Sequence, residues 1–219
     1  MQFDKILKEI IIGRSVLQQI EPIHSSTKTK INLSNLDTNL ALYILGGRAI
    51  TLSYTALLLL ANCRMSEIGA VIRLIEETVY LADYFYDSNE SDPNITKWLS
   101  NKIISPMKAR KAQSNIFKKV FGKTDNMFEQ KINELYGGMS EYIHPTYRIS
   151  KLNLNIITLE YDYEWIDRKN YDIKIFISVA QALVSVINMF RYCKDFYMVD
   201  ARIDAQLNNE ISKLDSLNI

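Results

Sequence analysis

The side chains best suited to proton transfer are few in this sequence. His24 and His144 are its two histidines, and imidazole titrates near neutral pH. His144 follows Ser140 by four residues and precedes Pro145, so Ser140 and His144 would share one face at the C-terminal end of a helix. The helix dipole there favours a protonated imidazole. His144 is therefore the candidate catalytic residue, whereas His24 falls in a polar stretch and is expected at the surface.

A second polar group lies within an apolar, helix-like stretch. Arg73 and Glu77 are four residues apart, so they lie on one helix face and can pair, and Tyr80 follows on that face. Two interpretations remain open. Arg73 could hold a charged phosphate while Glu77 orients it, or the two residues could form an interior ion pair that fixes the helix register.

The family resemblance set out in the next paragraph implies RNA as the substrate of a catalytic site built on these residues, which would need no metal or other cofactor. His144 would move a proton from the 2′-hydroxyl or to the leaving 5′-oxygen. Arg73 or Arg148 would stabilise the phosphate, and Ser140 would hydrogen-bond the imidazole ring or the phosphate. The alternative is that His144 only ends its helix, with its ring satisfied by Ser140 or by a nearby carboxylate.

These motifs resemble a known family. The helix Arg73-x-x-x-Glu77, followed by Val79-Tyr80-Leu81, and the later Ser140-x-x-x-His144-Pro145 are similar to bacterial all-helical proteins of the HEPN-like group. That resemblance implies a compact helical bundle, often dimeric, found in toxin–antitoxin and phage-defence systems, and in many members a metal-independent ribonuclease. Ribonuclease members place an Arg before the His with four to six residues between the two, whereas the corresponding positions 137–139 here are Gly-Gly-Met and Arg148 follows His144.

Charge is segregated along the chain, although the net charge is +1. Residues 74–96 hold six acidic and no basic side chains, and residues 97–123 hold eight basic and no acidic ones. The basic stretch includes the candidate nucleic-acid contacts Lys108, Arg110, Lys111, Lys118 and Lys119. With Trp98, Phe117 and Phe121 available for stacking, it is typical of an RNA-binding surface. The alternatives are solvated helix faces, or acidic and basic segments that face each other.

Several classes of protein are excluded by composition. With 7 Gly in 219 residues and no glycine-rich loop, the chain lacks Walker and Rossmann nucleotide motifs. Two Cys and two His without metal-ligand spacing predict no metal site. Asp4, Lys5, Lys8 and Glu9 interrupt any signal peptide, so we expect a cytoplasmic protein with reduced thiols. The uncharged run 49–63 is shorter than the about 20 residues that span a bilayer, which predicts a buried helix and no membrane contact.

Apolar periodicity predicts helices almost throughout. The main ones are expected over 2–20, 38–63, 67–86 and 171–199, with short helices from Pro93 and Pro106. Between them we expect a loop over 21–37, an acidic loop over 87–96 and a connector over 151–170 with a short extended segment near 152–163. The fold class is therefore all-α, a single-domain bundle of about six or seven helices over residues 1–219.

Two functional classes follow from the sequence. The first is a HEPN-like bacterial defence or toxin–antitoxin protein that binds or cleaves RNA. The second is a non-enzymatic interaction module, such as a scaffold or antitoxin-like subunit. The helix over 171–199 has no charge between Lys174 and Arg191, which places it either in the centre of the bundle or at an interface with a second copy of the chain. A homo-oligomer through this helix is expected, and another protein partner is a further candidate.

Overall fold

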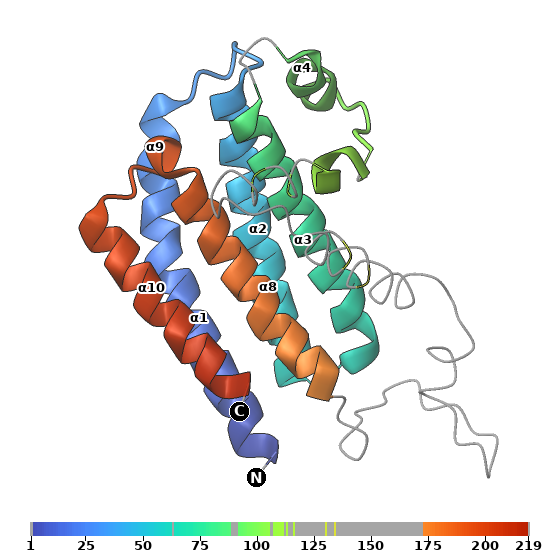
Figure 1. Cartoon of the computed structure of the whole chain (residues 1–219), viewed down its shortest axis with the longest axis vertical. Coiled ribbons are helices and arrows are strands. Elements are labelled where there is room, and N and C mark those ends of the chain that lie inside the picture. The colour runs from blue at the N-terminus through green and yellow to red at the C-terminus, as the bar shows by residue number, and fades with distance from the viewer. Residues whose placement is uncertain are drawn as a thin grey trace, which may run out of the picture.

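A computed structural model describes residues 2–62, 64–88, 92–105, 107–111 and 173–218, together with residues 113, 116, 130 and 134. These residues are helical or lie in turns, and none of them forms a strand, so the all-α prediction is confirmed. The long helices run side by side along the bundle (Figure 1). They are α1 (Gln2–Ser26), α2 (Thr38–Ala61), α3 (Met65–Asp87), α8 (Ile173–Tyr192) and α10 (Ala201–Asp215). Two shorter helices are α4 (Pro93–Leu99) and α9 (Lys194–Tyr197), and 3-10 turns cover Thr27–Lys30 and Ser216–Asn218.

Helix α2 is a core helix. Its first turn is capped by Asp37, whose carboxylate accepts a hydrogen bond from the Leu40 backbone N–H at 2.9 Å. By length and composition α2 could cross a membrane, and no other helix in the described ranges meets that test. Here it packs against α1, α3 and α8, and 44% of its most apolar stretch is buried. The prediction of a buried helix over 38–63 is confirmed.

Helix α8 occupies the centre of the bundle and packs against α1, α2, α3 and α10 (Figure 1). Its Val186, Ile187 and Phe190 are fully buried. Among the uncharged polar residues of the helix, Gln181 and Asn188 are exposed. Of the two placements expected for this helix, the central one is therefore observed.

The prediction of one helix over 171–199 was wrong at its C-terminal end. The described part of that range divides into α8 and α9, with Met198 in the left-handed region at a φ of 54°. The turn at Cys193 lets Tyr197 fold back against Phe190, with ring centroids 4.1 Å apart, and donate a hydrogen bond to the Leu42 carbonyl at 2.9 Å. A straight helix would carry Tyr197 away from both partners, so packing breaks the helix.

Helix α1 continues past Pro22, where the sequence predicted its end. Proline lacks the N–H that would bond to the carbonyl of Gln18. Both Pro22 and Gln18 are exposed, so water can satisfy that carbonyl. Ile20 is fully buried and Ile23 packs against the core, and these contacts carry the helix on to Ser26.

The Gly46-Gly47 doublet brings α1 and α9 close to α2. A Cβ on Gly46 would collide with the Tyr197 hydroxyl, and one on Gly47 would lie 3.3 Å from the His24 ring. His24 stacks on Tyr43 with ring centroids 4.6 Å apart, and its Nε2 lies 2.8 Å from the Tyr43 carbonyl. His24 is thus a half-buried packing residue, and the expectation that it would lie at the surface was wrong.

Two predicted helix starts have different outcomes. Helix α4 begins at Pro93 as predicted, and Asp92 caps it by accepting a hydrogen bond from the Asn94 N–H at 2.8 Å. Helix α3 begins at Met65, two residues before its predicted start at residue 67.

Helix α10 was not predicted. Asp200 caps it by accepting a hydrogen bond from the Ile203 N–H at 2.8 Å. The helix is tied to α8 by an ion pair between Arg191 Nε and Asp204 Oδ1 at 2.6 Å, and Leu207 and Leu214 are fully buried in the core. Both chain ends therefore lie at the same end of the bundle, opposite α4 (Figure 1).

Candidate functional site

The polar side of α3 is the candidate site. Arg73 Nε and Glu77 Oε1 form the predicted ion pair at 3.0 Å, so their pairing is confirmed. The two side chains are 15% and 27% exposed, which leaves their edges within reach of a ligand. The pair combines a fixed guanidinium with a carboxylate that orients it.

One turn away, a carboxyl group lies in the interior between α3 and α8. Glu76 is buried and receives hydrogen bonds from Ser185 on α8 and from Tyr80 on its own helix. Burial raises the pKa of Glu76 to about 7, although these two hydrogen bonds oppose the rise. The pKa of Tyr80 is raised by burial and by the neighbouring Glu76. Glu76 can therefore gain or lose a proton near neutral pH.

A second buried carboxyl group lies two helical turns further on. The amide of Gln113 donates a hydrogen bond to Asp83, and the thiol of Cys193, in the turn between α8 and α9, lies 4.0 Å from the other carboxyl oxygen. Burial raises the pKa of Asp83 to about 7, and the charge of Glu76 adds to the rise. Two acids with pKa values near 7 on one face of α3 form a cluster of the kind that marks functional sites. Glu76, Tyr80 and Asp83 are called the α3 polar cluster below.

Part of the basic stretch packs against this face. Residues 107–111, 113 and 116 are helical and are called the basic helix below. Besides the Gln113 contact, Lys108 Nζ lies 5.8 Å from the centre of the Tyr84 ring on α3, and the positive charge of Arg110 opposes the rise in the pKa of Tyr80. The acidic and basic stretches thus face each other here, which was one of the alternatives left open by the sequence.

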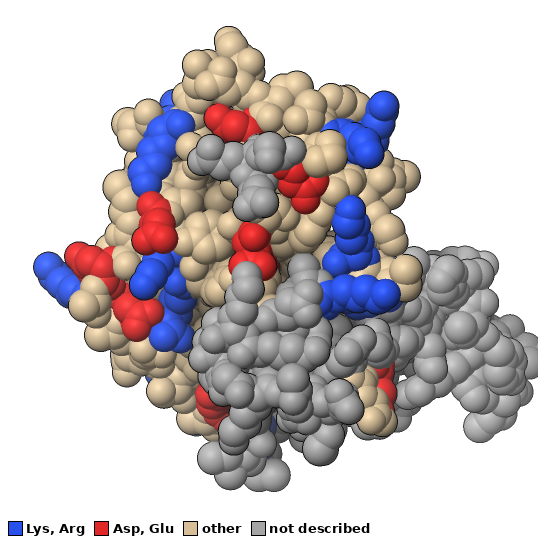
Figure 2. All heavy atoms as spheres, turned by 45° about the horizontal axis from the view of Figure 1, so that its top comes forward, with Lys and Arg blue, Asp and Glu red and all other residues tan. Residues whose placement is uncertain are grey.

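The candidate nucleic-acid contacts divide into inner and outer residues. Lys108 and Lys111 are exposed, whereas Arg110 is half-buried against α3. Figure 2 brings the α4 end of the bundle forward and shows acidic as well as basic side chains over the described surface, with no continuous basic field. Lys118 and Lys119 lie outside the described residues.

Three other predicted site residues, Ser140, His144 and Arg148, also lie outside the described residues, as does the expected connector over 151–170. The prediction that these residues join Arg73 and Glu77 therefore stays a prediction. Within the described residues, no three His, Cys, Asp or Glu side chains are placed to hold a metal ion.

The α3 polar cluster was not predicted from the sequence. Glu76 and Asp83 counted only toward the acidic stretch, although their spacing of seven residues in an apolar helix places them on one face. That spacing was the available signal. Their burial could not be foreseen, because it depends on segments that are distant in the sequence. Gln113 follows Asp83 by 30 residues, and Cys193 follows it by 110. Ser185, the partner of Glu76, is also more than 100 residues away.

Comparisons with known proteins identify no relative: no family model matches the chain, and no match is found among curated proteins or solved structures.

Proposed function

We propose that this protein is a HEPN-like bacterial defence or toxin–antitoxin protein that acts on RNA, with its site on the polar side of α3. The observation that carries the proposal is the half-buried Arg73–Glu77 ion pair next to two carboxyl groups with pKa values near 7. Buried charges lower stability unless they are well paired, and a helix that only needed to pack would be served by apolar residues here. An oriented guanidinium beside titratable groups suits a phosphodiester substrate.

In this proposal His144 takes the proton from an RNA 2′-hydroxyl. The 2′-oxygen attacks the phosphorus, the bond from phosphorus to the 5′-oxygen breaks, and the 5′-oxygen receives a proton as it leaves. Arg73, held by Glu77, neutralises the negative charge that develops on the phosphate. Arg148 supplies further positive charge, and Ser140 positions the imidazole or the phosphate.

The test is cleavage of a single-stranded RNA in the presence of a metal chelator, with a DNA of the same sequence as the control. The products should carry 2′,3′-cyclic phosphate and 5′-hydroxyl ends. Changing His144→Ala should lower the rate by about 10²–10⁴-fold without altering the elution volume or the helical content. Arg73→Ala should also lower the rate strongly, while Arg48→Ala, on the exposed side of α2, should leave it unchanged. Wild-type protein that neither cleaves RNA nor slows bacterial growth contradicts the enzymatic proposal.

RNA binding without cleavage is tested separately through the exposed lysines of the basic helix. Because Arg110 is half-buried, charge reversal belongs on Lys108 and Lys111. The double change to Glu should weaken RNA binding and flatten its salt dependence. Changing Lys8 and Lys28, which are exposed on α1 and in the following 3-10 turn, to Glu provides the matched control. Equal losses in both double variants contradict a specific RNA surface on the basic helix.

The second candidate function is a non-enzymatic interaction module, including a homo-oligomer through α8. It is favoured by large apolar side chains that remain exposed, among them Ile103 at 93% and Leu58 at 63%. For the α8 route, the exposed Gln181 and Asn188 would be the contact residues. Light scattering after size exclusion gives the native mass. A dimer that becomes monomeric on changing both residues to Lys supports the α8 route, and a wild-type monomer contradicts it.

A further inference from the structure

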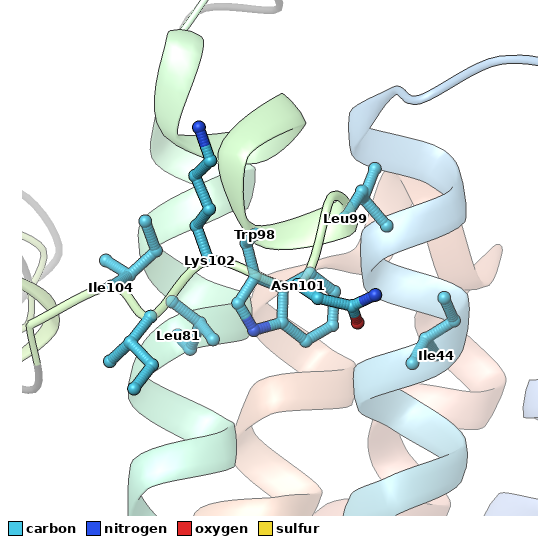
Figure 3. Close-up of a pocket in the computed structure, with 8 residues that line it drawn as sticks. Ile44, Leu81, Trp98, Leu99, Asn101, Lys102 and Ile104 are labelled. Carbon is cyan, nitrogen blue, oxygen red and sulfur yellow. The ribbon is translucent and has the colours of Figure 1, made fainter.

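A pocket of about 440 Å³ opens between α2, α3 and α4. It is lined mostly by apolar side chains from α2, α3, α4 and the segment after α4 (Figure 3). The described lining residues are Ile44, Leu81, Trp98, Leu99, Asn101, Lys102, Ile103 and Ile104. Pockets of this size with an apolar lining and few polar groups are typical of small-molecule sites.

The indole of Trp98 forms the centre of the pocket (Figure 3). It is held from behind by the fully buried Phe85, with ring centroids 5.6 Å apart. Ile44 of α2 and Leu81 of α3 lie on opposite sides of the indole in this view. The apolar wall is therefore built on the helices of the bundle, which makes it a fixed surface.

The polar groups of the pocket come from one tight turn after α4. Asn101 adopts the left-handed region at a φ of 63°, which non-glycine residues rarely occupy. Backbone hydrogen bonds from Asn101 N–H to the Trp98 carbonyl and from Lys102 N–H to the Lys97 carbonyl, both 2.9 Å, hold the turn. The Asn101 amide lies beside the indole, and the Lys102 side chain extends from the same turn toward solvent (Figure 3).

Charge at this pocket has one sign. Lys102 is the charged residue among the described lining residues. Its backbone N–H bonds to the carbonyl of Lys97, so the exposed Lys97 lies next to it. The rim also carries Ile103, whose side chain is 93% exposed, so a large apolar group faces water next to an apolar cavity. An occupant with an apolar body and one negative charge would cover Ile103 and complement the lysines.

We propose that this pocket binds a small apolar carboxylate. Its hydrocarbon body packs on Trp98, Leu81 and Ile44, while its carboxylate pairs with the Lys102 ammonium at the rim. The five aliphatic side chains around a single indole favour an alkyl chain over a nucleobase, which would need more polar groups along its edges. The inference does not depend on the proposed action on RNA.

Octanoate is the probe, and calorimetric titration of the full-length wild-type protein is the first measurement. We expect saturable binding at one site. Octan-1-ol has the same chain without the charge and should bind about three- to fivefold more weakly, since a partly exposed ion pair contributes up to about 1 kcal/mol. Absence of saturable heat at millimolar octanoate overturns the proposal, and so does equal affinity for octan-1-ol.

Tryptophan emission locates the site. Trp98 and Trp165 are the two tryptophans, so in a Trp165→Phe background the emission reports on Trp98 alone. Octanoate should shift this emission to shorter wavelength with the same dissociation constant as the heat signal. Octanoate that binds by calorimetry while the Trp98 emission stays unchanged overturns this location and with it the proposal.

Charge reversal at the rim completes the test. Lys102→Glu and Ile103→Glu change exposed side chains, so both variants should fold, and each should weaken octanoate binding by about tenfold or more. Leu58→Glu is the matched control, because Leu58 is a 63%-exposed apolar residue at the opposite end of α2 from Ile44. If all three variants bind octanoate like the wild type, binding occurs elsewhere and the proposal is wrong.

Discussion

Two adjoining sides of the buried face of α3 are built on different principles. The apolar side presents aliphatic residues such as Ile68, Ile72 and Ile75 to the core. The polar side next to it presents Glu76, Tyr80 and Asp83 to α8 and the basic helix, where hydrogen bonds replace much of the apolar contact. The neighbours Ile75 and Glu76 are both buried, yet one packs in the core and the other accepts hydrogen bonds. The apolar side therefore supplies stability, whereas the polar side holds carboxyl groups with pKa values near 7 at the expense of stability.

The largest effect is expected on the apolar side. Changing Ile75→Ala removes a side chain that is 1% exposed and leaves a cavity, so the free energy of unfolding should fall by about 2–5 kcal/mol. Chemical denaturation followed by circular dichroism measures the change. If Ile75→Ala costs less than 1 kcal/mol, the apolar side does not dominate stability and the contrast between the two sides fails.

The next effect is a fall in stability with rising pH. Burial raises the pKa of Glu76 from 4.5 to about 7, that of Asp83 from 3.8 to about 7 and that of Glu9, on α1, from 4.5 to about 9. The folded state therefore holds protons that the unfolded state has already lost. The contribution of these groups should be highest below pH 3.8, the lowest of their unfolded pKa values, and should decrease up to about pH 9. The decrease is about 1.4 kcal/mol per pH unit for each group between its unfolded and its folded pKa.

Thermal melts between pH 5 and pH 9 measure this dependence. Changing Glu9→Gln should remove the part that extends above pH 7, and changing Glu76→Gln should flatten the part below it. Other groups that titrate in this range add a common background, which cancels when each variant is compared with the wild type. A wild-type melting temperature that rises from pH 5 to pH 9, or variants that keep the full slope, contradict the assignment.

The smallest effect on stability is expected at the candidate site itself. Because the Arg73–Glu77 pair is partly exposed, Glu77→Ala should lower the free energy of unfolding by about 0.3–1 kcal/mol. The same change should lower RNA cleavage far more than stability, since it releases the guanidinium that holds the phosphate. If Glu77→Ala lowers stability and RNA cleavage by the same small amount, the Arg73–Glu77 pair serves only to stabilise the helix.

The sequence predicted helices well where neighbouring residues decide the structure. Apolar periodicity located α2 and the body of α3, and the Asp92-Pro93 pair located the start of α4. The Arg73–Glu77 pair followed from a spacing of four residues within one helix. Predictions failed where a distant segment overrides a local preference, as at Pro22 inside α1 and at Cys193 between α8 and α9.

The sequence by itself determined that this chain is all-α, lacks nucleotide-loop motifs and carries Arg73 and Glu77 on one helix face, because composition and spacing are local properties. Only the tertiary structure decided which polar side chains are buried. Glu76 and Asp83 titrate near neutral pH because α8 and the basic helix cover them, and the Trp98 pocket exists because three helices and one strained turn meet there. Desolvation and cavity shape depend on residues that are distant in sequence, so no local sequence pattern predicts them.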